Sequence, residues 1–150
     1  MQHRISAGVL ALRDGKVLLV RHFRAGQHDF WAGPGGGVEA AEQLHEAAER
    51  EAFEEAGVRV RARQMAYIDE LVDHWGRIVK FWFLADYLSG AVDVSANPAE
   101  SESIVEAGWF APDALPSGHV FPEVLRRRFW TDLEAGFPHP IKLPLRQSIF

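Results

Sequence analysis

The chain contains no cysteine, and this absence excludes several kinds of site at once. Disulfide bridges, thiolate zinc sites and cysteine nucleophiles all require the thiol group. Any metal ion that the chain binds must therefore be held by oxygen atoms or by imidazole nitrogen.

Positive charge and long apolar runs are also scarce. The chain has 16 lysines and arginines against 21 acidic residues, a formal net charge of -5. Nucleic-acid-binding proteins usually rely on basic patches to neutralise phosphates, so we expect no nucleic-acid partner. Apolar runs such as Val79–Leu88 fall far short of the roughly 20 residues of a membrane-spanning helix, so we expect no membrane partner. The net negative charge does not exclude a small phosphorylated ligand, because divalent cations can bridge two anionic groups.

The length and composition fit one globular domain over residues 1–150. The hydrophobic fraction is 47% and the charged fraction 25%, which is ordinary for a folded protein. The first ten residues, MQHRISAGVL, lack the charged, apolar and small-residue segments of a secretory signal. We therefore expect a cytoplasmic protein.

The order of strand and helix patterns predicts a mixed β-sheet covered by helices, an α/β fold. Asp14-Gly15 favours a tight hairpin turn between two apolar strands. The Ala/Glu-rich stretch from about Ala40 to Ala56 contains strong helix formers and ends at Gly57. A second helix is expected between Pro122 and Gly136, and the proline-rich tail after it is expected to lie extended on the surface. The predicted strands are Ile5–Leu12, Lys16–Arg21, Phe30–Ala32, Val58–Ile68, Arg77–Tyr87 and Ile104–Phe110.

Three glutamates in the first predicted helix form an unusual group. Glu51, Glu54 and Glu55 follow the i, i+3, i+4 spacing that places side chains on one side of a helix. Their mutual repulsion destabilises the helix unless a cation is nearby, and Mg²⁺ prefers carboxylate oxygens and phosphates. The alternative is an ordinary solvated face on which Arg50 offsets part of the repulsion.

The surrounding spacing is more specific than the glutamates alone. From Gly36 the chain has five residues, Glu42, seven residues, and then Arg50-Glu51-Ala-Phe-Glu-Glu-Ala-Gly57-Val. This segment resembles the Nudix box without a gap. The preceding WAGPGG is similar to the Trp-x-x-Pro-Gly-Gly segment that leads into the box, and EAGWFAPDAL (residues 106–115) is similar to the late strand and short helix of that family.

The resemblance implies the Nudix-type α/β/α sandwich and hydrolysis of a diphosphate bond in a nucleoside diphosphate linked to another group. It assigns Glu51, Glu54, Glu55 and Gly36 to a site for Mg²⁺, with Mn²⁺ as a substitute. It also makes Arg50 the residue that orients one of the carboxylates. Glu42 is the expected ion-pair partner of this arginine, and members of the family are frequently homodimers.

The same resemblance leaves the general base and the substrate open. The catalytic set is Glu54, Arg50 and Glu51, with Glu54 as the first choice of base and the later Glu102 or Glu106 as rivals. A nucleoside triphosphate or related nucleotide is the favoured substrate. Dinucleoside polyphosphates and ADP-ribose or sugar nucleotides are alternatives, as is a non-catalytic nucleotide-binding module. An isoprenyl diphosphate isomerase, which also resembles this fold, is a further alternative. Such an enzyme is expected to use a nearby cysteine, and this chain has none.

Three residues outside the box are candidates for substrate binding. Arg21 follows the second strand, where it either contacts phosphate or is an ordinary surface arginine. Trp75 lies in a predicted connection and has a ring that can stack on a base. Glu102 is the third candidate for substrate binding, because it is also the rival of Glu54 as the general base and would then lie near the substrate.

Overall fold

The sheet begins with the hairpin expected at Asp14-Gly15. Strand β1 (Gln2–Arg13) turns back into β2 (Lys16–Arg24), and both turn residues have positive φ angles, 51° and 74°. Two-residue turns of this kind match the twist of antiparallel strands. The structure is a computed structural model and describes residues 1–95, 97 and 103–149.

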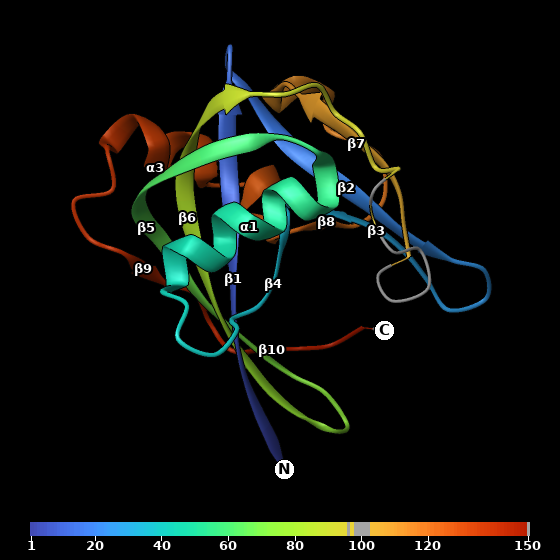
Figure 1. Cartoon of the computed structure of the whole chain (residues 1–150). Helices are drawn as coiled ribbons and strands as arrows, with labels where there is room; N and C mark the ends of the chain where they lie inside the picture. The colour runs from blue at the N-terminus through green and yellow to red at the C-terminus, as the bar shows by residue number, and fades with distance from the viewer. Residues whose placement is uncertain (96, 98–102, 150) are drawn as a thin grey trace.

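Within the described residues the strands form one mixed sheet (Figure 1). Its main path runs β10-β5-β6-β1-β2-β3-β8, and β4, β7 and β9 pair with β1, β2 and β5. The contact between β1 and β6 is parallel, whereas β5 and β6 form an antiparallel hairpin. The strands after the first hairpin are β3 (His28–Ala32), β4 (Gly35–Gly37), β5 (Arg59–Val72), β6 (Gly76–Ser89), β7 (Ile104–Phe110), β8 (Val120–Phe121), β9 (Ile141–Lys142) and β10 (Arg146–Gln147).

Helix α1 (Leu44–Ala56) covers one face of the sheet through alanines (Figure 1). Ala47, Ala48, Ala52 and Ala56 are all fully buried in a cluster that also contains Val9 of β1. Because alanine has no side-chain atoms beyond Cβ, a stripe of alanines lets the helix backbone lie close to the strands. The glutamates between these alanines are thereby held near the sheet.

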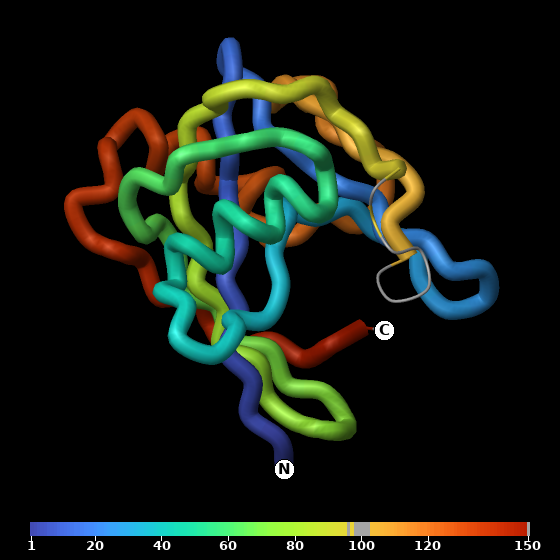
Figure 2. The backbone as a smooth tube through the Cα atoms, in the orientation of Figure 1, coloured from blue at the N-terminus to red at the C-terminus, as the bar shows by residue number. Residues whose placement is uncertain are grey.

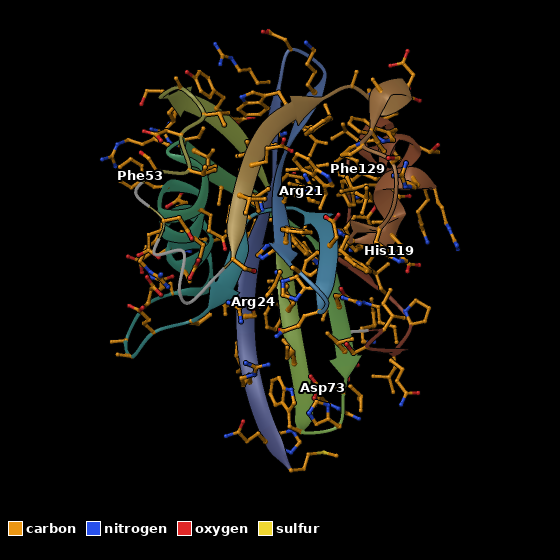
Figure 3. The ribbon with its side chains drawn as sticks, turned by 90° about the vertical axis from the view of Figure 1, so that its right-hand side faces the viewer. Arg21, Arg24, Phe53, Asp73, His119 and Phe129 are labelled. Carbon is orange, nitrogen blue, oxygen red and sulfur yellow. The ribbon has the colours of Figure 1, made fainter. Side chains whose placement is uncertain are left out.

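The opposite face is covered by aromatic residues and by the second helical region. That region contains η2 (Glu123–Arg126) and α3 (Phe129–Ala135), and a short η1 (Pro112–Ala114) precedes it. Phe129 is fully buried in a cluster with Tyr67 and Trp82. Figure 3 shows Phe53 of α1 and Phe129 of α3 on opposite sides of the strands. The expected α/β fold, with a mixed sheet between helices, is confirmed.

Three local details differ from the sequence-based expectations. Helix α1 begins at Leu44 rather than near Ala40, because the capping box of Gln43 and Glu46 satisfies its first backbone N–H groups. The second helix is interrupted between η2 and α3. The tail does not simply lie on the surface: its backbone returns to the sheet (Figure 2), and β9 and β10 pair with β5. Leu143 of the tail is buried. No helix in the described part of the chain is long and apolar enough to cross a bilayer.

The glycine loop that precedes α1 is fixed against the indole of Trp82. A Cβ atom on Gly33 would lie 2.7 Å from the carbonyl oxygen of Val9 and 2.8 Å from Cζ3 of Trp82. A Cβ atom on Gly8 would lie 2.7 Å from the same Cζ3. Only glycine permits this approach, so the buried tryptophan sets the position of the loop.

We predict that Gly33→Ala lowers the free energy of unfolding by about 1–3 kcal/mol, the usual cost of forcing an extra methyl group into a packed site. The matched control is Gly37→Ala, because a Cβ atom there meets no atom within 4 Å. Urea denaturation of both variants measures the difference. Equal stabilities would mean that the loop is not held by this close approach.

Candidate active site

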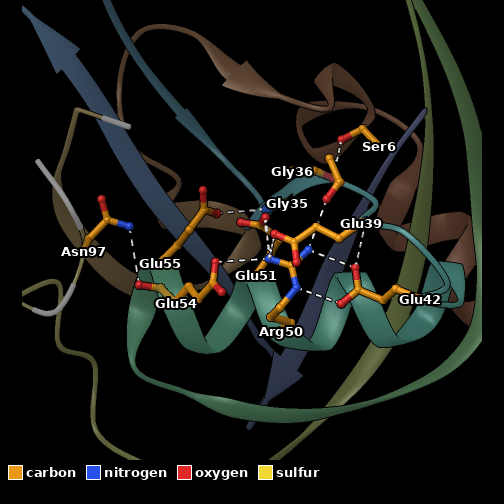
Figure 4. Close-up of polar contacts among 11 residues, drawn as sticks. Ser6, Gly35, Gly36, Glu39, Glu42, Arg50, Glu51, Glu54, Glu55 and Asn97 are labelled. Atoms are coloured by element: carbon orange, nitrogen blue, oxygen red, sulfur yellow. Dashed lines mark hydrogen bonds and ion pairs between the residues drawn. The ribbon is translucent and has the colours of Figure 1, made fainter. Parts of the chain in front are cut away.

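The three glutamates of the Nudix-like segment lie on α1 beside the glycine loop (Figure 4). Glu51 and Glu55 are 5% and 1% exposed, whereas the side chain of Glu54 is 47% exposed. Gly57 ends the helix with a φ of 72°, and its N–H donates to the carbonyl of Phe53. The helix therefore presents two buried carboxylates and one exposed carboxylate within little more than one turn.

The buried carboxylates are held directly against the loop backbone. The N–H of Gly35 donates to Oε1 of Glu55 at 2.9 Å. A Cβ atom on Gly36 would lie 2.5 Å from Oε1 of Glu51, so a side chain there would displace this carboxylate. The carbonyl of Gly36 accepts a 2.8 Å hydrogen bond from the hydroxyl of Ser6 on β1. Helix, loop and first strand are thus joined through polar contacts at one place.

Arg50 connects the carboxylates on the solvent side. Its guanidinium lies 2.7 Å from Glu42, 3.0 Å from Glu51 and 3.1 Å from Glu54. The ion pair with Glu42 expected from the sequence is therefore present. The hydrogen bond to Glu42 raises the pKa of Arg50, and it lowers the pKa of Glu42 from 4.5 to about 2. The arginine stays charged and offsets the repulsion among the acidic groups.

The donor atoms at this place suit a hard divalent cation. Glu51, Glu54 and Glu55 supply carboxylate oxygens, and Gly36 supplies a carbonyl oxygen, the ligand types that Mg²⁺ prefers. Among the described side chains, no three acidic or imidazole groups are already gathered as a metal site. Instead, one nitrogen of Arg50 contacts both Glu51 and Glu54. The chemistry of the donor set fits a metal, while its present contacts are those of an ion-pair network.

A cavity of about 280 Å³ adjoins the glycine loop. Gly33 and Gly35 form one wall, and Gly35 is also the residue that donates to Glu55. The aromatic rings of Phe30, Trp82 and Phe121 line other parts of it. Such a concave, largely apolar cavity with a few polar groups is typical of sites for small ligands.

Besides His22 of β2, the polar groups of this cavity come from β5, β6 and the tail. Asp69 of β5 is 2% exposed and accepts hydrogen bonds of 3.3 and 3.4 Å from Arg146 of β10. Lys80 of β6 also lines the cavity, and burial lowers the pKa of its ammonium group against the attraction of Glu55, Asp69 and Glu51. Neither Asp69 nor Lys80 belongs to a local sequence motif, so neither was among the predicted site residues. The only sequence signal was a charged residue within a predicted strand or directly after its end.

The candidates outside the box lie away from this cavity wall. Arg21 binds Asp29 through two hydrogen bonds of 2.9 Å, which raises the pKa of Arg21 and lowers that of Asp29; it also lies 3.8 Å from Glu106. Trp75 lies in the β5–β6 connection, with the guanidinium of Arg4 3.5 Å from its ring centroid. Neither is among the described residues that line the cavity. Glu102 lies outside the described residues.

We predict that Glu42→Gln lowers the free energy of unfolding at pH 7 and that this difference shrinks in acid. The folded pKa of Glu42, about 2, lies below its ordinary value of 4.5. Its stabilising contribution is therefore complete above about pH 4.5 and is lost as the pH falls toward 2. Urea denaturation of wild type and variant between pH 7 and pH 2.5 measures the effect.

The matched control for this pH series is Glu39→Gln. Glu39 is also near Arg50, but its side chain is 71% exposed and the separation is 3.7 Å. Its replacement should change stability little at any pH, since exposed ion pairs contribute little. A Glu42 variant that behaves like the Glu39 variant would contradict the role given to this ion pair.

Comparison with known proteins agrees with the geometry. A sequence model described as NUDIX domain matches residues 2–130. The NAD-capped RNA hydrolase NudC of Shigella dysenteriae serotype 1 (strain Sd197) is 35% identical over 117 residues, which cover 77% of this chain and 42% of that protein. The chain therefore spans about two fifths of the length of this curated relative.

Solved structures are similar over most of the chain. The crystal structure of a MutT NUDIX hydrolase from Burkholderia pseudomallei is 30% identical, with a TM-score of 0.70 over 84% of this chain and 95% of that one. A NUDIX hydrolase from Nitrosomonas europaea has a TM-score of 0.75 at 22% identity, over 97% of this chain and 81% of that one, which shows the shared fold alone. Since the family match covers most of the chain, including the whole glycine loop and α1, this chain belongs to the NUDIX domain family.

Proposed function

We propose that this chain is a Mg²⁺-dependent pyrophosphohydrolase that cleaves a phosphoanhydride bond of a nucleotide, with nucleoside triphosphates as the first choice of substrate. The observation that carries the proposal is the burial of Glu51 and Glu55 against the backbone of Gly35 and Gly36. Burying two neighbouring carboxylates is costly unless cations balance them. The metal ion of a bound metal–nucleotide complex would supply the positive charge that balances these two carboxylates.

The residues that would hold the ion are Glu51, Glu54, Glu55 and the carbonyl of Gly36. A bound divalent ion supplies charge neutralisation on phosphate oxygens and lowers the pKa of a coordinated water. Arg50 keeps Glu51 and Glu54 oriented through contacts of 3.0 and 3.1 Å. Mn²⁺ would substitute, because it accepts the same oxygen ligands.

Glu54 is the proposed general base. It is the most exposed of the three carboxylates, so water reaches it without movement of the helix. Arg50 contacts both Glu51 and Glu54, so exposure is what distinguishes Glu54: Glu51 and Glu55 are buried, and Glu55 also accepts the N–H of Gly35. Glu102 stays a rival for this role.

The substrate would place its nucleoside in the aromatic cavity and its phosphates beside the glutamates. Phe30 is partly exposed and offers a π surface of the kind on which a base stacks, while the buried Trp82 and Phe121 add apolar lining. Because the curated relative is named as an NAD-capped RNA hydrolase, NAD⁺ and NAD-capped RNA belong in any test beside triphosphates, ADP-ribose and dinucleoside polyphosphates. We also propose that Arg21 and Trp75 contact the substrate outside the cavity. Assembly of two copies of the chain into a homodimer is a separate proposal.

A hydrolysis screen over these nucleotides, with identification of the products, tests the function. We predict phosphate or nucleoside monophosphate release with Mg²⁺, loss of turnover on chelation with EDTA, and recovery when Mg²⁺ or Mn²⁺ is restored. Saturable binding of a nucleotide without release of product from any of them would instead support a non-catalytic binding module. Undiminished turnover after chelation would contradict the metal dependence.

We predict that Glu54→Gln and Glu55→Gln each reduce kcat by about 100-fold to 10,000-fold, the range expected for loss of acid–base catalysis or of a metal ligand. Both variants should stay folded, because glutamine can still accept the hydrogen bond from Gly35 and a repulsion is removed. Steady-state kinetics and thermal denaturation measure the two effects.

Glu46→Gln is the matched control for these variants. Glu46 lies on the same helix and is exposed, and a glutamine there can still complete the capping box. Its turnover should equal that of the wild type. Near-wild-type turnover in both Glu54→Gln and Glu55→Gln would refute the proposed site.

A further inference from the structure

Lys80 is the cation on the inner side of the carboxylate group. It lies on β6 and lines the cavity together with Gly35, while a Cβ atom on Gly35 would lie 2.8 Å from its Nζ atom. Gly35 in turn donates its N–H to Glu55. The ammonium group is therefore located where the aromatic cavity meets the glutamates.

This ammonium group has an unusual environment. Within the part of the chain that the structure describes, Lys80 makes no hydrogen bond and no ion pair, and its ammonium group lies over the face of Trp82, 4.2 Å from the ring centroid. The charges of Glu55, Asp69 and Glu51 act on it from further away. A lysine ammonium has three hydrogen-bond donors, and a partly buried one is costly when they have no acceptor.

Arg50 and Lys80 differ in whether their hydrogen-bond donors are occupied. Arg50 contacts Glu42, Glu51 and Glu54 on the solvent side, so its donors are already used. The donors of Lys80 remain available to a molecule in the cavity. The indole N–H of Trp82, in the same wall, also has no hydrogen-bond partner among the described residues.

We propose that Lys80 donates a hydrogen bond to a non-bridging oxygen of the phosphoryl group next to the nucleoside, at the point where the nucleotide passes from the aromatic cavity to the glutamates. This inference rests on the proposed function. The glutamates repel a phosphoryl group on one side, and the lysine offsets that repulsion on the other. Lys80 thus fixes how far the nucleotide enters the site and selects phosphorylated ligands over nucleosides.

The test measures binding without turnover. The affinities of AMP, GMP, CMP and UMP, and of the four matching nucleosides, are determined by calorimetry in EDTA for the wild type, Lys80→Met, Lys80→Gln and Lys80→Arg. The control is Lys16→Met, because Lys16 is exposed at the start of β2. Thermal denaturation of each variant checks the fold, and we expect the neutral variants to stay folded since they remove a poorly solvated charge.

We expect Lys80→Met and Lys80→Gln to weaken binding of the preferred monophosphate by roughly 10-fold to 100-fold, as for loss of a charge-assisted hydrogen bond. Nucleoside affinity should not change, and Lys80→Arg should retain most of the monophosphate affinity. With the hydrolysed substrate, KM should rise more than kcat falls. Lys16→Met should match the wild type throughout.

Three results would overturn the proposal. Unchanged monophosphate affinity in both neutral variants would show that Lys80 does not contact phosphate. Equal losses for nucleosides and monophosphates would assign Lys80 to the base instead. A wild-type chain that hydrolyses nucleotides but binds no monophosphate would contradict this inference alone, whereas one that neither hydrolyses nor binds them would contradict the proposed function as well.

Discussion

The burial of Glu51 and Glu55 against a glycine backbone is the constraint on which the rest of this site depends. Two like charges on one helical turn, both nearly inaccessible, destabilise the fold unless nearby donors and cations compensate. Part of the compensation is local, from Arg50 and from the N–H of Gly35. The glycines follow from the same constraint, because a side chain at Gly36 would overlap the carboxylate of Glu51.

The scaffold meets this constraint with two kinds of packing. On one face, the alanine stripe of α1 brings the helix close to the sheet, so that its inward glutamates reach the loop. On the other side of the loop, Trp82 fills the space that side chains at Gly8 and Gly33 would need. A helix with larger apolar residues, or a loop with larger side chains, would separate the carboxylates from the backbone that holds them.

Positive charge is distributed unevenly around the carboxylates. Arg50 is saturated by acidic partners on the solvent side, and it orders the site. Lys80 lies on the cavity side over the face of Trp82, with no hydrogen bond or ion pair within the described residues. One cation therefore maintains the structure, while the other is available to a ligand. Under the proposal made for Lys80, this division would let a chain with net negative charge bind a phosphate.

The sequence alone determined the parts of the protein that depend on local spacing. The hairpin at Asp14-Gly15 and the glutamate helix follow from turn preferences and helical periodicity, and the resemblance to the Nudix box implied the ion pair between Glu42 and Arg50. Only the tertiary structure decided which glutamates are buried and that the tail pairs with β5. It alone placed Lys80 beside Gly35, because strands distant in sequence meet through the packing of the sheet and no local pattern records that meeting.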